Sequence, residues 1–209
     1  NGGETTPHPW INVIANERFG AHISGEGAGF TWSSNSRDYQ LTPWSNDPVT
    51  NRPGEAIYVV DQQSKKIFSP FAALSRNPEA RFETRHGLGY SRFSSVEDGL
   101  HIDLVQTVDV DQPVKLTRVT LRNNTNRAMS LKAYGYVEWV LGTNAQRTAP
   151  YIVSGFDEAT GALVASNPYS IDYNERQSFL MLDRAPDAFT SDRREFIGRY
   201  GAIHRPEAI

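Results

Sequence analysis

The stretch Gly99–Val110, with the sequence GLHIDLVQTVDV, indicates the fold class most clearly. Apolar and polar side chains alternate through it. One face carries Leu100, Ile102, Leu104, Val108 and Val110, and the other carries His101, Asp103, Thr107 and Asp109. Because successive side chains of a β-strand point to opposite faces, this alternation predicts a long, half-buried strand.

The stretches that follow Gly99–Val110 extend this pattern. Ser130–Leu141 places Leu131, Ala133, Gly135, Val137, Trp139 and Leu141 in one phase, which predicts a second long, half-buried strand. Val114–Arg122 (VKLTRVTLR) changes its apolar phase midway, which predicts a bulge or burial on both faces. The turn-forming segments Asp111–Pro113 and Asn123–Asn126 separate these strands at hairpin spacing.

Shorter stretches of β-forming residues occur along the rest of the chain. The further strand candidates are Phe19–Ile23, Gly29–Trp32, Ala56–Val60, Lys66–Phe68, Arg81–His86, Tyr90–Phe93, Tyr151–Gly155, Ala162–Ala165 and Ser178–Leu182. About a dozen short strands predict an all-β antiparallel sandwich or barrel. Glycine and proline are spread evenly and mark no linker, so residues 1–209 are expected to form a single β-sandwich domain.

Composition excludes several classes of protein. The net charge is −3, from 21 basic and 24 acidic residues, and no basic run occurs, so we expect neither nucleic acid nor an anionic membrane as a partner. Cysteine is absent, which excludes disulfide scaffolds and thiol catalysis. No apolar stretch approaches the roughly 20 residues of a membrane helix, so no direct membrane insertion is expected. The first residues, NGGETTPHPW, do not resemble a signal peptide, and a start without Met suggests a fragment.

Familiar catalytic and metal-binding patterns are missing. The five histidines (His8, His22, His86, His101 and His204) have no metal-ligand spacing, so no metal or cofactor is expected. No GxSxG occurs, and Gly25–Gly29 departs from GxGxxG and precedes a strand, so it is interpreted as a hairpin turn. Several carboxylates are conceivable for glycoside chemistry and none stands out: Asp38, Asp47, Glu55, Asp103, Asp109, Glu138 and Asp157.

One long irregular segment, Ser33–Gly54, is the best candidate for function. It spans roughly 20 residues without periodicity, and loops of that length in compact domains are usually functional or disordered. Aromatic and polar residues alternate in and next to it: Trp32, Asn35, Arg37, Asp38, Tyr39, Trp44, Asn46 and Asp47. Aromatic faces with amides, carboxylates and Arg suit sugar binding. Core or loop anchoring by Trp32 and Trp44, with the polar residues forming Asx turns, fits equally well. The second cluster, Tyr134, Tyr136 and Trp139, is interpreted as packing.

Several blocks resemble glycoside hydrolase family 94, the inverting disaccharide and oligosaccharide phosphorylases. The first is Thr6–Asn16 (TPHPWINVIAN), and Phe19-Gly20, Gly27–Trp32 and Asn35–Arg37 follow in the family's order. Within the family, Leu41–Val49 (LTPWSNDPV), Tyr136–Gly142 (YVEWVLG) and Arg147–Pro150 (RTAP) are most similar to the carboxy-terminal region of cyclic β-1,2-glucan synthases. The resemblance extends over essentially the whole chain.

The resemblance implies an antiparallel β-supersandwich of the galactose mutarotase type, followed in the family by linker helices and an (α/α)6 barrel. The family's general acid, an Asp, and its phosphate-binding residues lie in that barrel, and inorganic phosphate is a co-substrate of the parent enzyme. The chain ends at Ile209, before any barrel, and is expected to be a truncated copy of the sandwich. No catalytic residue is therefore assigned to it. By resemblance, phosphate attacks the anomeric carbon with inversion while the acid protonates the departing oxygen.

These considerations give a leading expectation and two alternatives. The chain is expected to be a non-catalytic sandwich domain of a bacterial β-1,2-glucan enzyme, supporting the barrel, a homodimer and the rim of the glucan site. The residues expected to contact a β-glucan oligosaccharide are Arg37, Asp38, Trp44, Asn46 and Asp47. One alternative is a structural interaction module with no sugar contact, and the other is a mutarotase-type epimerase using His86 or His101. By analogy the parent is expected at the bacterial inner membrane, with this domain on the cytoplasmic side.

Overall fold

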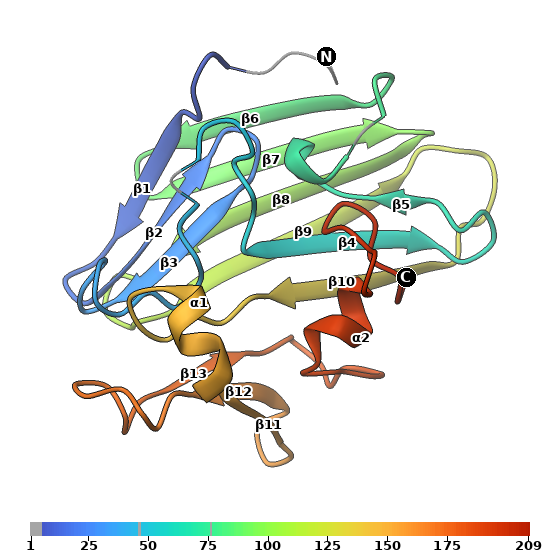
Figure 1. Cartoon of the computed structure of the whole chain (residues 1–209). Coiled ribbons are helices and arrows are strands. Elements are labelled where there is room, and N and C mark those ends of the chain that lie inside the picture. The colour runs from blue at the N-terminus through green and yellow to red at the C-terminus, as the bar shows by residue number, and fades with distance from the viewer. Residues whose placement is uncertain (1–5, 46, 76) are drawn as a thin grey trace.

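A computed structural model describes residues 6–45, 47–75 and 77–209, and its architecture is all-β (Figure 1). The strands are β1 (Ile11–Ala15), β2 (Phe19–Ser24), β3 (Gly29–Ser33), β4 (Glu55–Asp61), β5 (Ile67–Phe68), β6 (Arg81–Gly87), β7 (Tyr90–Glu97), β8 (Leu100–Val108), β9 (Lys115–Asn123), β10 (Leu131–Val137), β11 (Val153–Asp157), β12 (Ala162–Ser166) and β13 (Gln177–Leu180). Short helices are η1 (Ala72–Leu74), α1 (Ala145–Thr148), η2 (Ala149–Tyr151) and α2 (Arg193–Ile197). The antiparallel strand pairs confirm the predicted fold class.

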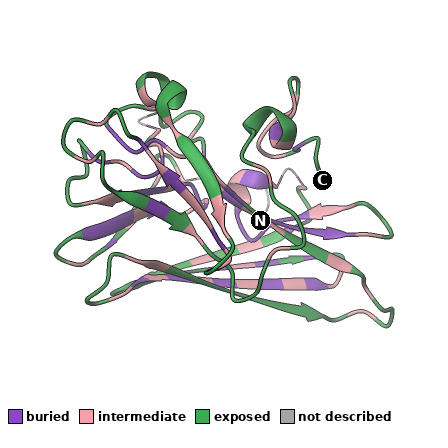
Figure 2. Ribbon diagram, turned by 90° about the horizontal axis from the view of Figure 1, so that it is seen from below, coloured by how far each residue is buried: buried purple, intermediate pink, exposed green. Residues whose placement is uncertain are grey.

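The strands form a two-layered sandwich with a small extra sheet. The back layer is the four-stranded sheet β6-β7-β8-β9, and the sheets β1-β2-β3 and β10-β4-β5 lie over one of its faces (Figure 1). The sheet β11-β12-β13 lies beside this sandwich. Figure 2 shows that buried residues gather between the layers. That the whole chain forms one domain stays a prediction.

Strand β8 is the centre of the core, as the alternation in Gly99–Val110 predicts. Leu100, Ile102 and Leu104 are almost completely buried. Leu104 packs with Ile14 and Ile23 from the β1-β2-β3 sheet, while Leu100 and Ile102 pack with Val59 of β4. Val110 lies beyond the end of β8 and is exposed, so its predicted burial is wrong.

The predictions for Val114–Arg122 and Ser130–Leu141 need correction. Strand β9 pairs with β8 residue for residue, so it has no bulge. It is exposed on both faces along nearly its whole length, so the overlying sheets leave this edge of the layer uncovered. Strand β10 is also an edge strand, and its Ala133 and Gly135 are exposed. The more deeply buried face of β10 is instead the one that carries Tyr136, whose ring stacks on Phe196 of α2 with a centroid distance of 5.5 Å. Tyr136 therefore packs, as predicted for the second aromatic cluster.

Candidate functional site

The segment Ser33–Gly54 is tied to the sandwich near its middle. The backbone N–H of Leu41 donates to the Thr31 carbonyl at 2.8 Å, and the Val140 N–H donates to the Leu41 carbonyl at 2.9 Å. Tyr39 is only 2% exposed and stacks on Tyr173 at 4.3 Å. Tyr39 is therefore an anchor of the segment, although the anchoring interpretation named Trp32 and Trp44 instead.

Trp44, in contrast, lies on the surface. Its side chain is 52% exposed, and its ring stacks on Phe30 with a centroid distance of 5.9 Å and an interplanar angle of 22°. The ring of His22 meets it edge-on at 5.7 Å. Trp32 lies 5.3 Å from Phe30 on the same face of β3. We call these four residues (His22, Phe30, Trp32 and Trp44) the aromatic surface.

Strand geometry explains why the aromatic surface forms. Phe30 and Trp32 are two residues apart on β3, and His22 of the neighbouring strand β2 pairs directly with Phe30. All three side chains therefore point away from the four-stranded sheet. A Cβ added to Gly20 would lie 2.3 Å from the Trp32 ring, so the absence of a side chain at Gly20 lets the indole lie flat. The Trp44 residue thus stacks on Phe30 while about half of its surface stays exposed to solvent.

Polar groups border the aromatic surface on one side. A hollow of only about 10 Å³ lies among His22, Trp44, Asn51 and Arg52, so a sugar ring would lie over the surface rather than inside it. The Asn51 amide donates to Ser24 and to Glu26, both at 3.1 Å, and thereby holds the end of the loop. The Arg52 guanidinium pairs with the Glu138 carboxylate at 2.5 Å. Burial holds the pKa of His22 below its usual value.

The other predicted contact residues are not brought to Trp44 by any contact in the described part of the chain. The Asn35 side chain accepts from the backbone N–H groups of Arg37 and Asp38, which makes an Asx turn, and the Arg37 side chain is 91% exposed. Asp47 accepts from the Thr50 hydroxyl at 2.8 Å and the Val49 N–H at 2.9 Å, and these bonds lower its pKa. Asn46 lies outside the described residues.

His22, Phe30, Asn51 and Arg52 were missed as site residues by sequence reasoning. The alternation in β2 and β3 places His22 and Phe30 on one face, but it does not say which face is covered. Asn51 and Arg52 follow Trp44 by several residues in an irregular segment, so no periodicity links them.

The two histidines of the mutarotase alternative lie on opposite faces of the four-stranded sheet. His86 contacts the buried Ser91 at 2.9 Å, on the core side of β7. His101 contacts Ser94 at 2.8 Å, on the outer side. The single histidine base of that alternative would therefore face the core if it were His86 and the outer surface if it were His101.

The candidate carboxylates are held by cations or by their own turns. Glu55 pairs with Lys115, Glu138 with Arg52, and Asp103 with Arg92, while Asp109 and Asp157 accept from neighbouring backbone N–H groups. No group of three or more potential metal ligands lies together in residues 6–45, 47–75 and 77–209. Among the described helices, none is long and apolar enough to cross a membrane.

One surface feature is visible only in the fold. Cross-strand pairing aligns Arg85, Arg92, Val105 and Arg118 in one row across the outer face of the four-stranded sheet. Arg81 and Arg122 lie in a second row with Val96 and His101. Five arginines thus share this face without a basic run in the sequence, but Arg85 pairs with Glu83 and Arg92 with Asp103 on the same face. The expectation of no nucleic-acid partner stays a prediction.

Comparison with known proteins identifies the family. Residues 1–209 match the family described as glycosyl hydrolase 94, supersandwich domain. The chain belongs to this family. The family assignment and the all-β model together confirm the resemblance and the supersandwich fold.

Curated relatives of this glycosyl hydrolase 94 chain are bacterial carbohydrate enzymes. The chain is 58% identical over 208 residues to a protein named cyclic beta-(1,2)-glucan synthase NdvB from Rhizobium meliloti (strain 1021), covering 100% of the chain and 7% of that protein. It is 24% identical to N,N'-diacetylchitobiose phosphorylase from Vibrio proteolyticus, covering 97% of the chain and 26% of the relative. It is 25% identical to solabiose phosphorylase from Paenibacillus borealis, covering 99% of the chain and 28% of the relative. The chain therefore spans less than a third of the length of each.

Proposed function

We propose that these residues form a non-catalytic supersandwich domain in an enzyme that makes or cleaves a β-1,2-glucan. The 58% identity over the whole chain to the protein named cyclic beta-(1,2)-glucan synthase supports this substrate class. The described carboxylates and histidines form no catalytic constellation, which supports a role outside the chemical step. The domain supports the catalytic barrel and a homodimer and adds its loop to the rim of the glucan site. Phosphate remains a co-substrate of the barrel.

The observation that carries the rim assignment is the stacking of Trp44 on Phe30. An indole fixed on one side and open on the other is suited to lie against the C–H face of a pyranose. Ser45 and Arg52 next to it offer a hydroxyl and a guanidinium that can bond sugar hydroxyls. Arg37, Asp38 and Asp47 of the same segment, with Asn46, stay proposed contacts on the resemblance and the loop composition alone.

A specific observation also favours the second candidate, a structural interaction module. Val13 pairs with His22 across β1 and β2 and shares the face of the aromatic surface, and Ile11 and Val13 are both at least half exposed. Exposed apolar side chains next to Trp44 suit a protein partner, such as the barrel or a second protomer. The membrane association of the parent and the cytoplasmic side of this domain rest on the resemblance to the synthases.

The experiment that separates the two candidates is the substitution Trp44→Ala in the complete natural polypeptide. If Trp44 stacks on the glucan, the KM for β-1,2-gluco-oligosaccharides rises about two- to twelvefold, which corresponds to an aromatic contact of about 0.5–1.5 kcal/mol. Tyr169→Ala, another exposed aromatic, is the matched control and leaves KM unchanged. Unchanged kinetics together with altered subunit assembly would favour the interaction module.

A further inference from the structure

A second hollow lies away from the aromatic surface. It has a volume of about 630 Å³ and is lined by residues from the β4–β5 turn, the η1 region, the end of β7 and the segment near the C-terminus. We call it the β5 groove. Strand β4 begins at Glu55, where the segment Ser33–Gly54 ends, and finishes at Asp61, beside the turn that lines the β5 groove (Figure 1). A seven-residue strand is roughly 20 Å long, so the two places are separate.

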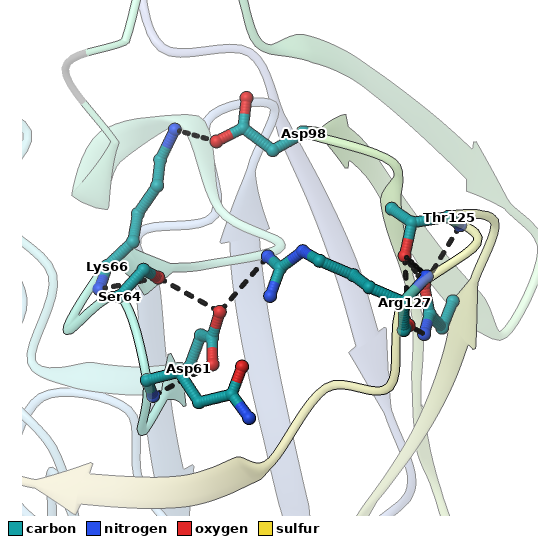
Figure 3. A network of polar contacts seen from close by, with 8 residues as sticks. Asp61, Ser64, Lys66, Asp98, Thr125 and Arg127 are labelled. Carbon is teal, nitrogen blue, oxygen red and sulfur yellow. Dashed lines mark hydrogen bonds and ion pairs between the residues drawn. The ribbon is translucent and has the colours of Figure 1, made fainter.

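A buried carboxylate is fixed at one wall of the β5 groove. Glu97 is only 8% exposed, and its Oε1 accepts from the Asn77 amide at 2.6 Å and from the Lys66 ammonium at 2.8 Å. Lys66 also donates to Asp98 at 2.6 Å (Figure 3). Because each of these groups is held by another, the wall is ordered before any ligand arrives, and little side-chain entropy is lost on binding.

A second polar network supports the turn that carries Lys66. The Asp61 carboxylate accepts from the Ser64 hydroxyl at 2.9 Å and from Arg127 at 3.1 Å, as Figure 3 shows. The backbone N–H of Gln63 also donates to Asp61 at 3.1 Å, and these bonds hold the pKa of this carboxyl below its usual value. The β4–β5 turn therefore has a defined shape.

Charge in and around the β5 groove is balanced. The lining contains three cations (Lys65, Lys66 and Arg205) and two carboxylates (Glu79 and Glu97), and a third carboxylate, Asp98, pairs with Lys66. A free anion would gain little net attraction from such a surface, because the formal charges of these six groups sum to zero and Lys66 is already paired with Glu97 and Asp98. A hydroxyl group both donates and accepts, so alternating donors and acceptors are suited to a ligand rich in hydroxyls.

We propose that the β5 groove is a second carbohydrate site, which binds a short neutral gluco-oligosaccharide apart from the aromatic surface. Its volume is in the range of ligand sites, about 300–1,000 Å³. Ile67 adds an apolar side chain for the C–H face of a sugar ring, while Leu74 beneath it belongs to the core. Asn77, Glu79 and Arg205 supply the amide, carboxylate and guanidinium that bond its hydroxyls. The site does not depend on Trp44, so it stands or falls separately from the proposed function.

The test is hydrogen–deuterium exchange of the complete natural polypeptide, which reports protection locally even where another sugar site exists. The probe is linear β-1,2-glucotriose at millimolar concentration, with inorganic phosphate at the same concentration as the anionic comparison. We expect the trisaccharide to slow exchange in peptides that cover residues 62–79 and 200–207. Glu79→Ala and Arg205→Ala, both at exposed positions, each weaken this protection at least tenfold, and Trp44→Ala leaves it unchanged.

The control variant is Glu158→Ala, in the exposed turn between β11 and β12, which retains full protection. Absence of protection in these two peptides overturns the proposal. A thermal unfolding measurement on the same sample establishes that the protein is folded. If Glu79→Ala and Arg205→Ala show the same protection as the unsubstituted protein, the proposal is also overturned. Protection by phosphate without protection by the trisaccharide would assign the groove to anions, which contradicts a neutral-sugar site.

Discussion

The ammonium group of Lys115 on β9 contacts the carboxylate of Glu55 at the start of β4, and this ion pair joins the two layers of the sandwich. Their side chains are only 13% and 16% exposed. The other carboxylate oxygen of Glu55 accepts from the hydroxyls of Thr31 at 2.7 Å and Thr42 at 2.9 Å. The pair thus connects β3, β4, β9 and the segment Ser33–Gly54.

Loss of one partner of this pair is expected to destabilise the fold strongly. Glu55→Gln leaves the Lys115 ammonium without its counter-charge in a mostly buried place, which costs about 3–5 kcal/mol. Urea denaturation measures the loss. The double variant Glu55→Gln/Lys115→Met removes both charges and should recover part of it. A double variant less stable than the single one would contradict the importance of the unpaired charge.

The same pair predicts a dependence of stability on acid. Burial raises the pKa of Glu55, but the Lys115 charge and the hydrogen bonds from Lys115, Thr31 and Thr42 outweigh it, so the folded-state pKa lies below the ordinary value of 4.5. A depressed carboxyl pKa adds stability above about pH 4.5 that is lost as the pH falls through the folded-state pKa. Unfolding free energies measured from pH 6 to pH 3 should fall less steeply in Glu55→Gln. An identical slope in both proteins would rule out this origin.

Gly20 is predicted to be essential for the position of Trp32. A Cβ at Gly20 would lie 2.3 Å from the indole, so Gly20→Ala displaces the ring and costs about 1–3 kcal/mol. Gly135→Ala in β10 is the matched control, because no atom lies within 4 Å of its added Cβ. Chemical denaturation followed by tryptophan fluorescence measures both. Equal stability of the two variants would show that Trp32 moves freely.

His22 predicts a second pH effect, at the aromatic surface. Because burial lowers its pKa below the ordinary value of 6.5, the unfolded chain takes up a proton at His22 more readily than the folded one. The stability that neutral His22 contributes is therefore complete above pH 6.5 and is lost as the pH falls below it. His22→Gln should reduce the slope of unfolding free energy between pH 7 and 5, and His8→Gln, on the exposed N-terminal segment, should not. Equal slopes in His22→Gln and the unsubstituted protein would contradict this assignment.

The sequence predicts the strands well where one face is covered. Leu100, Ile102 and Leu104 alternate because β8 lies at the centre of a layer with a core on one side. The same reasoning fails at β9 and β10, because edge strands keep a β pattern without a fixed buried face. Strand β1 (Ile11–Ala15) was not predicted, because its INVIA sequence has no alternation. The short helices α1 and α2 contain too few turns for a helical period.

The candidate site was predicted only in part, for a similar reason. Trp44 stood out as an aromatic residue in an irregular segment, but its partners depend on contacts between distant parts of the chain. His22 and Phe30 come from two strands, and Arg52 is held by Glu138, 86 residues further along. The β5 groove combines turns that are more than a hundred residues apart, such as Lys66 and Arg205, and no local pattern connects them.

The most direct test of the central claim is a titration of the protein with β-1,2-gluco-oligosaccharides, followed by tryptophan fluorescence, with cellobiose as the linkage control. Formation of glucose 1-phosphate from the oligosaccharide and added phosphate is assayed in the same samples. The variant Trp44→Phe identifies the contribution of that indole to the fluorescence change. We expect saturable quenching that is selective for the β-1,2 linkage and is lost in Trp44→Phe. We expect no turnover by these 209 residues. No response at millimolar sugar from protein that circular dichroism shows to be folded would contradict the sugar contact and leave a structural module.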